Sequence, residues 1–145
     1  VVGDTFVVGC KLPKSIVYYD CIDFHPDKNN SINGLYRECC GLDDLYLSYG
    51  HDEYLYQVLK QNSNKHFISE DYLNIIRYHS FYPWHSNYEY VYFMDDSDYD
   101  KMRLVQDFNE FDLYSKEDTD LVITDELKNY YNELLNEYFR GELQW

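Results

Sequence analysis

The chain has 145 residues, of which 45% are apolar and 19% aromatic, so it can form the hydrophobic core of one domain. Acidic residues outnumber basic ones by 27 to 12, and the formal net charge of −15 disfavours binding to nucleic acids and to anionic lipid surfaces. No apolar run approaches the roughly 18 residues that a membrane-spanning helix needs. These features predict a single domain over residues 1–145, with neither a nucleic-acid nor a membrane partner.

The cysteines and the start of the chain bear on its origin. Cys10, Cys21, Cys39 and Cys40 lack CxxC spacing, and no basic-then-apolar leader is present. We interpret them as reduced thiols of a cytoplasmic protein, with a zinc site as the less favoured alternative. Because residues 1–4 (VVGD) include no initiator Met, we expect the chain to begin inside a longer protein.

The first forty residues predict irregular structure with short strands. Residues 6–8 and 16–18 are short β-prone runs, and residues 26–31 have the composition of a turn-forming loop. Gly3 and Asp4 are compatible with an ordinary turn, or with a backbone amide and a carboxylate offered to a polar ligand. The two readings remain open at this point.

Helical periodicity begins near Leu42 and continues to about Gln61, with an interruption at Gly50. This pattern predicts two helices that meet at an angle, the second of which begins at His51. A histidine at the positive end of a helix dipole stays neutral and can bind a metal. A surface histidine beside a helix cap is the alternative that this segment alone favours.

The next helix is predicted from Ser69, a good N-cap, to about Ser80, where Pro83 prevents its continuation. One face carries an apolar stripe that includes His79, so we expect this imidazole to point into the core; the stripe consists of Tyr72, Ile75, Ile76 and His79. A buried imidazole needs partners, and a metal is one candidate. Considered alone, His79 and His85 are more readily interpreted as packed or solvated, since six-residue spacing matches no standard metal motif.

Two further helices complete the prediction. Residues 99–113 place Asp112 on the same face as Met102, Val105 and Phe108, and a carboxylate in a core is costly unless it is paired or bound to a metal. A metal ligand is therefore the favoured reading of Asp112, with a buried salt bridge as the alternative. The acidic residues 95–98 are read as a solvated loop rather than a calcium site.

The last helix begins after Thr124 and stops before Gly141, and it is read as scaffold. Its expected buried face consists of Leu127, Tyr131, Leu134, Leu135 and Tyr138. We expect the terminal Trp145 to pack back onto the body of the protein.

Four segments together resemble the myo-inositol oxygenase family, and the resemblance extends over essentially the whole chain. They are residues 2–6 (VGDTF), 50–54 (GHDEY), 79–85 (HSFYPWH) and 108–114 (FNEFDLY), and residues 141–145 (GELQW) also match. The resemblance implies an all-α fold related to the HD-domain hydrolases. The chain would then be an incomplete HD-domain-like helical bundle with an irregular, short-strand N-terminal stretch.

The resemblance also implies a chemistry. The family uses a di-iron site and O₂ to cleave the ring of myo-inositol to D-glucuronate. His51 and His79 would bind the iron that chelates the substrate, and Asp112 would bind the other iron. Gly3, Asp4 and Ser80 match positions that bind inositol hydroxyls, with His79 beside them, and the resemblance assigns no separate catalytic residue.

The resemblance places the family's remaining iron ligands upstream of the position that matches Gly3. The complete protein is expected to be monomeric, and this portion alone is expected to have weak or no activity. Two other readings are a phosphohydrolase on the related HD scaffold and an inactive remnant without metals. The absence of a basic phosphate-binding cluster disfavours the phosphohydrolase.

Overall fold

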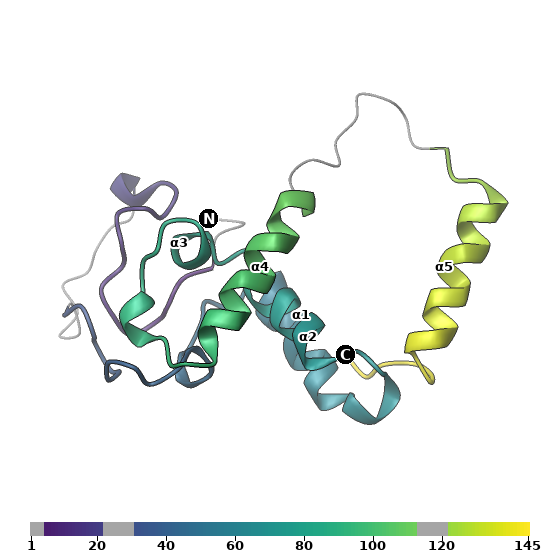
Figure 1. Ribbon diagram of the computed structural model, residues 1–145, viewed down its shortest axis with the longest axis horizontal. Helices are drawn as coiled ribbons and strands as arrows, with labels where there is room; N and C mark the ends of the chain where they lie inside the picture. Colours follow the sequence, from purple (N-terminus) through teal and green to yellow (C-terminus); the bar gives the residue numbers. More distant parts are fainter. Residues whose placement is uncertain (1–4, 22–30, 113–121) are drawn as a thin grey trace.

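The computed structural model describes residues 5–21, 31–112 and 122–145. Its helices are connected by irregular segments and short 3₁₀ turns (Figure 1), and the bounds are α1 (His51–Gln61), α2 (Glu70–Tyr78), α3 (Tyr82–His85), α4 (Asp98–Asp112) and α5 (Asp125–Tyr138). The turns are η1 (Tyr19–Cys21), η2 (Leu42–Asp44), η3 (Ser63–Lys65) and η4 (Val91–Phe93). The described residues include isolated β-bridges but no sheet, which confirms the all-α prediction.

A short antiparallel contact joins the N-terminal segment to the segment before α1. Val7 and Leu47 form a β-bridge, and the Ser48 amide donates to the Phe6 carbonyl over 2.8 Å. The predicted helix before Gly50 is therefore wrong, apart from the single turn η2. The backbone of residues 46–48 bonds across to residues 6–8, and those bonds replace the local bonds of a helix.

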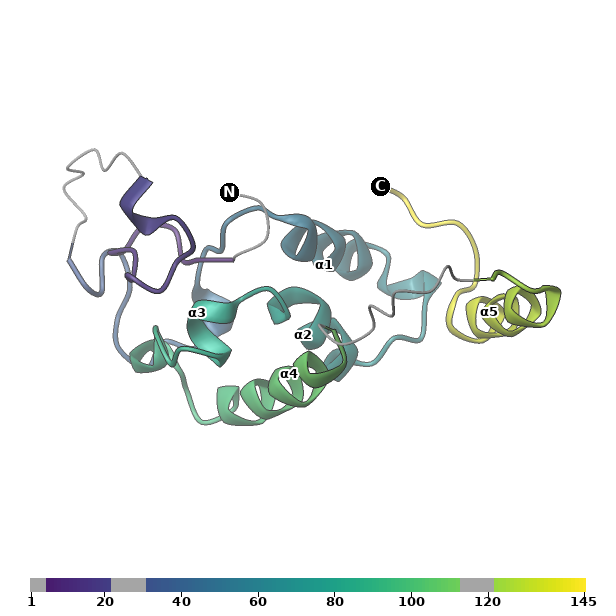
Figure 2. The same ribbon diagram turned by 90° about the horizontal axis from the view of Figure 1, so that it is seen from above.

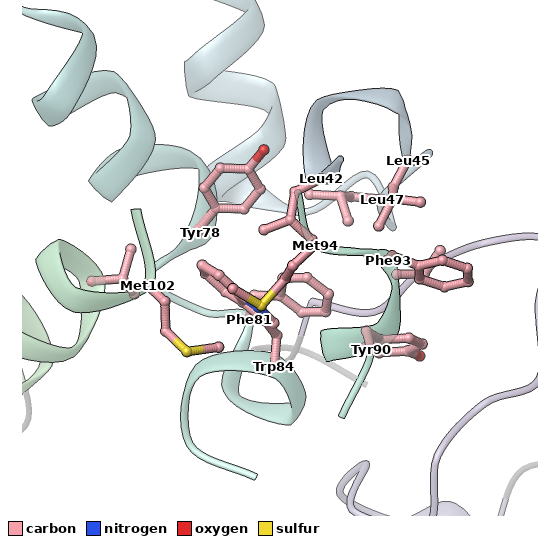
Figure 3. Packing of buried hydrophobic residues seen from close by; sticks show 12 residues of the cluster. Leu42, Leu45, Leu47, Tyr78, Phe81, Trp84, Tyr90, Phe93, Met94 and Met102 are labelled. Carbon is pink, nitrogen blue, oxygen red and sulfur yellow. The ribbon is translucent and has the colours of Figure 1, made fainter. Parts of the chain in front are cut away.

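The main hydrophobic core is rich in aromatic side chains and lies between α3, α4, the C-terminal end of α2 and the segment after α3 (Figure 3). Tyr78, Phe81, Trp84 and Phe93 are fully buried. The rings of Phe81 and Trp84 lie 5.7 Å apart between centroids, within the range of favourable aromatic contacts. This core fixes the segment between α2 and α3, which begins with His79 and Ser80.

Charged side chains connect α1, α2, η2 and α4 beside this core. Arg77 on α2 is 6% exposed, and its Nε atom lies 2.8 Å from the carboxylate of Glu53, itself 7% exposed on α1. Arg77 also pairs with Asp43 at 3.0 Å, and Lys101 on α4 lies 2.8 Å from both Asp43 and Asp98. The three helices are thus held together by paired charges as well as by apolar packing.

Helix α5 stands apart from the other helices in both views (Figures 1 and 2). Thr124 caps it as predicted, because its hydroxyl accepts a hydrogen bond from the Leu127 amide. The predicted buried face is wrong, since no residue of α5, all of which the structure describes, is buried. Trp145 stacks on the ring of Tyr54, with 6.3 Å between centroids, yet it remains 77% exposed.

All four cysteines lie within the described ranges and are free. Within the same ranges, no helix combines the length and the apolar composition that crossing a membrane requires.

Candidate functional site

The imidazoles of His51 and His79 meet where α1 begins and α2 ends. Their Nε2 atoms lie 3.1 Å apart, and their ring centroids are 5.0 Å apart with the planes nearly perpendicular. His51 is the first residue of α1, after Gly50 at the N-cap, as predicted, and His79 is the C-cap residue of α2. Residues that are 28 positions apart in sequence therefore present their ring nitrogens to one point.

A backbone contact determines the tautomer of His79. Its Nδ1 atom lies 2.9 Å from the carbonyl oxygen of Ile76, and a carbonyl can only accept a hydrogen bond. Nδ1 therefore carries the proton, and the Nε2 atom that faces His51 offers a lone pair. Metal-binding histidines are commonly oriented in this way, with the second ring nitrogen donating to a carbonyl or a carboxylate.

The two imidazoles open into a cavity of about 290 Å³ between α1, α2 and α4. Its wall is mostly apolar and consists of His51, Asp52, Leu55, Tyr72, Ile75, Ile76, His79, Phe108 and Asp112. The predicted stripe on α2 thus exists, but it lines this cavity rather than the core. The residues of α2 that are buried are Leu73, Asn74, Arg77 and Tyr78, and His79 is only half-buried.

Asp112 does not occupy the buried position that its helical spacing predicted. It is the last residue of α4 and is exposed, because the inner face of the helix ends with Met102 and Val105. Its carboxylate nevertheless belongs to the wall of the same cavity as His51 and His79. Among residues 5–21, 31–112 and 122–145, no group of three histidine, cysteine, aspartate or glutamate side chains is close enough to hold a metal ion.

The imidazole pair on its own fits one metal ion. Two nitrogens that bind the same ion at about 2.1 Å and at a right angle lie about 3.0 Å apart. The observed separation of 3.1 Å agrees with that value, and it equally allows Nε2 of His51 to donate a hydrogen bond to Nε2 of His79 when no metal is bound. Imidazole nitrogen is a ligand that suits iron as well as zinc and copper. The residues present therefore fit a metal held by two histidines, and Asp112 is not grouped with them.

The residues expected to bind a polyol have different outcomes. Gly3 and Asp4 lie outside the described residues. Ser80 is 4% exposed, and its hydroxyl oxygen lies 3.3 Å from Nε2 of His51, beside the imidazole pair. Ser80 therefore lies next to both histidines, and its role in binding a polyol stays a prediction.

His85 is buried next to the site and bonds to the backbone of His79. Its Nε2 atom lies 3.0 Å from the His79 carbonyl, so it must donate there, and its Nδ1 atom then accepts from the hydroxyl of Ser86 at 3.0 Å. Burial lowers the pKa of His85, an effect opposed by its bond to the His79 carbonyl. The interpretation of His85 as a packed histidine is confirmed. Its hydrogen bond holds the backbone carbonyl of His79 in place.

Sequence reasoning missed two residues at this site. Asp52 is 1% exposed and lines the cavity beside His51, although the helix dipole alone is enough to explain a carboxylate in a first helical turn. Phe108 packs its ring edge against His79, with 6.3 Å between centroids. The apolar neighbours of His79 on α2 were the available signal for such a wall, but they could not identify α4 as the partner.

Comparison with known proteins assigns the chain to a family. The family model described as myo-inositol oxygenase matches residues 1–145. An inositol oxygenase of Danio rerio is 47% identical over 150 residues, which cover 100% of this chain and 53% of that protein. Inositol oxygenases of Dictyostelium discoideum and Mus musculus are 42% and 41% identical and are covered over 50% and 52% of their lengths.

The chain spans about half the length of the curated relatives that it matches. The match nevertheless includes every residue of the chain, and with it the histidine pair, Ser80 and Asp112. The chain belongs to the myo-inositol oxygenase family.

Proposed function

We propose that this chain is part of an inositol oxygenase that cleaves the ring of myo-inositol with O₂ to D-glucuronate at an iron site. The observation that supports this most directly is the separation of 3.1 Å between the Nε2 atoms of His51 and His79. Family membership provides the substrate and the reaction, and the imidazole pair provides a place for a metal. The activity belongs to the full-length protein that contains this chain.

Each residue at the site has a role in this proposal. His51 and His79 would hold one iron of a di-iron centre, and Asp112 on the cavity wall would bind the second. Ser80 would donate a hydrogen bond to an inositol hydroxyl next to His51, and Gly3 and Asp4 would bind further hydroxyls. When bound, iron supplies the redox chemistry and lowers the pKa of a coordinated alcohol.

The remaining wall of the cavity would determine how the substrate is oriented. Leu55, Ile75, Ile76 and Phe108 are apolar and would exclude water from the face of the ring that does not bind polar groups. A cavity of about 290 Å³ is at the lower end of the range usual for small-molecule sites. A compact polyol such as inositol is compatible with that size.

The proposal is tested by replacing one imidazole in the full-length protein. His79→Ala should abolish inositol-dependent O₂ uptake while the protein stays folded, because one of the two nitrogen ligands is lost. The matched control is His66→Ala, which removes a buried imidazole bonded to the Leu59 carbonyl, outside the cavity. His66→Ala should lower stability and retain uptake by the folded protein.

Two results would contradict the proposal. Unchanged O₂ uptake by His79→Ala would show that the site lies elsewhere. Release of phosphate from phosphate esters without O₂ uptake would favour the related phosphohydrolase reading. We further propose a cytoplasmic, monomeric enzyme; four free thiols are consistent with a reducing compartment.

A further inference from the structure

A buried hydrogen bond joins the N-terminal segment to the start of α1, directly beside the imidazole pair. The hydroxyl of Thr5 donates to Oδ2 of Asp52, and the two residues are 2% and 1% exposed. The other oxygen of Asp52 accepts from the Glu53 amide at 2.8 Å. Both carboxylate oxygens are therefore engaged.

Thr5 also bonds to the second histidine-bearing segment. Its backbone amide donates to the carbonyl of Ser80 over 2.8 Å. Ser80 follows His79 in the chain, and Asp52 follows His51. Thr5 thus spans the start of α1 and the end of α2 at the two positions that directly adjoin the imidazoles.

The contacts form a closed circuit around the site. Thr5 bonds to Asp52, Asp52 is covalently attached to His51, His51 lies 3.3 Å from the Ser80 hydroxyl, and the Ser80 carbonyl accepts from Thr5. The backbone at Gly50 lies close to the Asp52 carboxylate, since a Cβ atom at Gly50 would lie only 2.9 Å from Oδ1 of Asp52. A shift of one helix end relative to the other would break one of these bonds.

We propose that Asp52 and Thr5 are positioning residues that hold His51 and His79 at metal-binding separation. Asp52 would not itself bind the metal, because Thr5 and the Glu53 amide already engage its oxygens. Losing the Thr5 hydroxyl would leave a buried carboxylate oxygen without its donor, and Asp52 would move towards water in the cavity. This movement would carry His51 with it. The inference rests on the proposed metal site of an inositol oxygenase.

The test measures the affinity of the full-length protein for Co²⁺, followed by visible absorption, together with its thermal midpoint. Thr5→Val keeps the shape of the side chain and the amide bond to Ser80 but removes the hydroxyl. It should weaken Co²⁺ binding by about 10- to 100-fold, the range seen when a group that helps to orient a metal ligand is removed. Thr5→Ser keeps the hydroxyl and should restore affinity to within a few-fold of the parent. Asp52→Asn should weaken binding as Thr5→Val does, because one amide oxygen cannot replace two carboxylate acceptors.

The matched control is Thr124→Val, which removes the exposed cap hydroxyl of α5. It should lower the thermal midpoint without changing Co²⁺ affinity. If Thr5→Val does not fold, the affinity of Asp52→Asn decides the question. A folded Thr5→Val or Asp52→Asn protein that binds Co²⁺ within twofold of the parent would overturn the proposal.

The outcome can be separated from that of the proposed function. A parent protein that binds Co²⁺ yet shows no inositol-dependent O₂ uptake with iron would contradict the proposed reaction and leave the positioning test valid. A parent protein that binds no Co²⁺ would contradict both. Loss of affinity in the two variants, with rescue by Thr5→Ser, would support the positioning role whatever the substrate proves to be.

Discussion

At the scale of single residues, the backbone of His79 depends on a buried donor. His85 is 1% exposed and bonds to the His79 carbonyl at 3.0 Å. We predict that His85→Phe lowers the free energy of unfolding by about 1–3 kcal/mol, because the partly buried His79 carbonyl loses its donor. Urea denaturation measures this loss. Ser86→Ala removes the exposed hydroxyl that donates to Nδ1 of His85 and should cost less than His85→Phe, because water can replace that donor; equal losses for the two variants would contradict the prediction.

The same scale shows which residue positions could be predicted from sequence. His51 and His79 were placed correctly at a helix start and a helix end, because Gly50 and Pro83 are local signals. The exposure of Asp112 could not be predicted, because helical spacing identifies a face and not how far along the helix a neighbour extends. Asp52 was missed because its partner, Thr5, lies 47 residues away in the sequence.

At the scale of secondary-structure elements, Arg77 holds α1 and α2 together. Its side chain and that of Glu53 are 7% and 9% exposed, with 2.8 Å between Nε and the carboxylate. Arg77→Met should lower the free energy of unfolding by about 3–5 kcal/mol, because Glu53 would be left as a buried, unpaired charge. The measurement is chemical denaturation of the folded chain or of the full-length protein.

The control for Arg77→Met is Lys60→Met, which breaks the exposed pair between Lys60 and Glu70. That pair joins the same two helices, so the two variants differ chiefly in burial. Lys60→Met should cost at most about 1 kcal/mol, the usual upper value for an exposed ion pair. Comparable losses would show that the burial of Arg77 is not what matters.

Asp43 makes the junction of α2, η2 and α4 sensitive to acid. Desolvation raises the pKa of Asp43, but the hydrogen bond and charge of Lys101, with help from Tyr78 and Arg77, outweigh it and lower this pKa below the ordinary 3.8. The stability contributed is therefore present above pH 3.8 and is lost as pH falls through the lower pKa of the folded state. Asp43→Asn should flatten this part of the acid-unfolding profile; an unchanged slope relative to the parent would contradict the assignment.

The accuracy of the helix predictions depended on whether the structure of a segment is determined by local or by distant residues. Helices α2, α4 and α5 were predicted nearly to their ends because caps and apolar periodicity are encoded within each segment. The helix expected before Gly50 was wrong because residues 46–48 pair with residues 6–8. Such pairing involves residues distant in sequence, and periodicity within one window contains no information about it.

At the scale of the whole molecule, α5 is attached mainly through its C-terminal end. The Phe67 amide donates to the Tyr138 carbonyl at 2.8 Å, and His66 forms a β-bridge with Phe139. A groove of about 360 Å³ lies between α5 and α2, and its apolar lining includes Tyr72, Tyr131, Leu134 and Leu135. The helix α5 could be predicted from its own sequence. Its lack of buried residues could not, because burial depends on which other elements pack against the helix.

This attachment gives a prediction for hydrogen exchange in the 145-residue chain. Amides of α5 should exchange much faster than those around Met102 and Val105 in α4, because α5 has no buried residue while these two side chains lie in the core. Local opening of an unburied helix costs little free energy, whereas exposing the core requires global unfolding. Mass spectrometry of peptides from the two helices measures the difference. If α5 were protected as strongly as α4, its face would have to be covered in solution, and the arrangement in Figures 1 and 2 would not be the one that the isolated chain adopts.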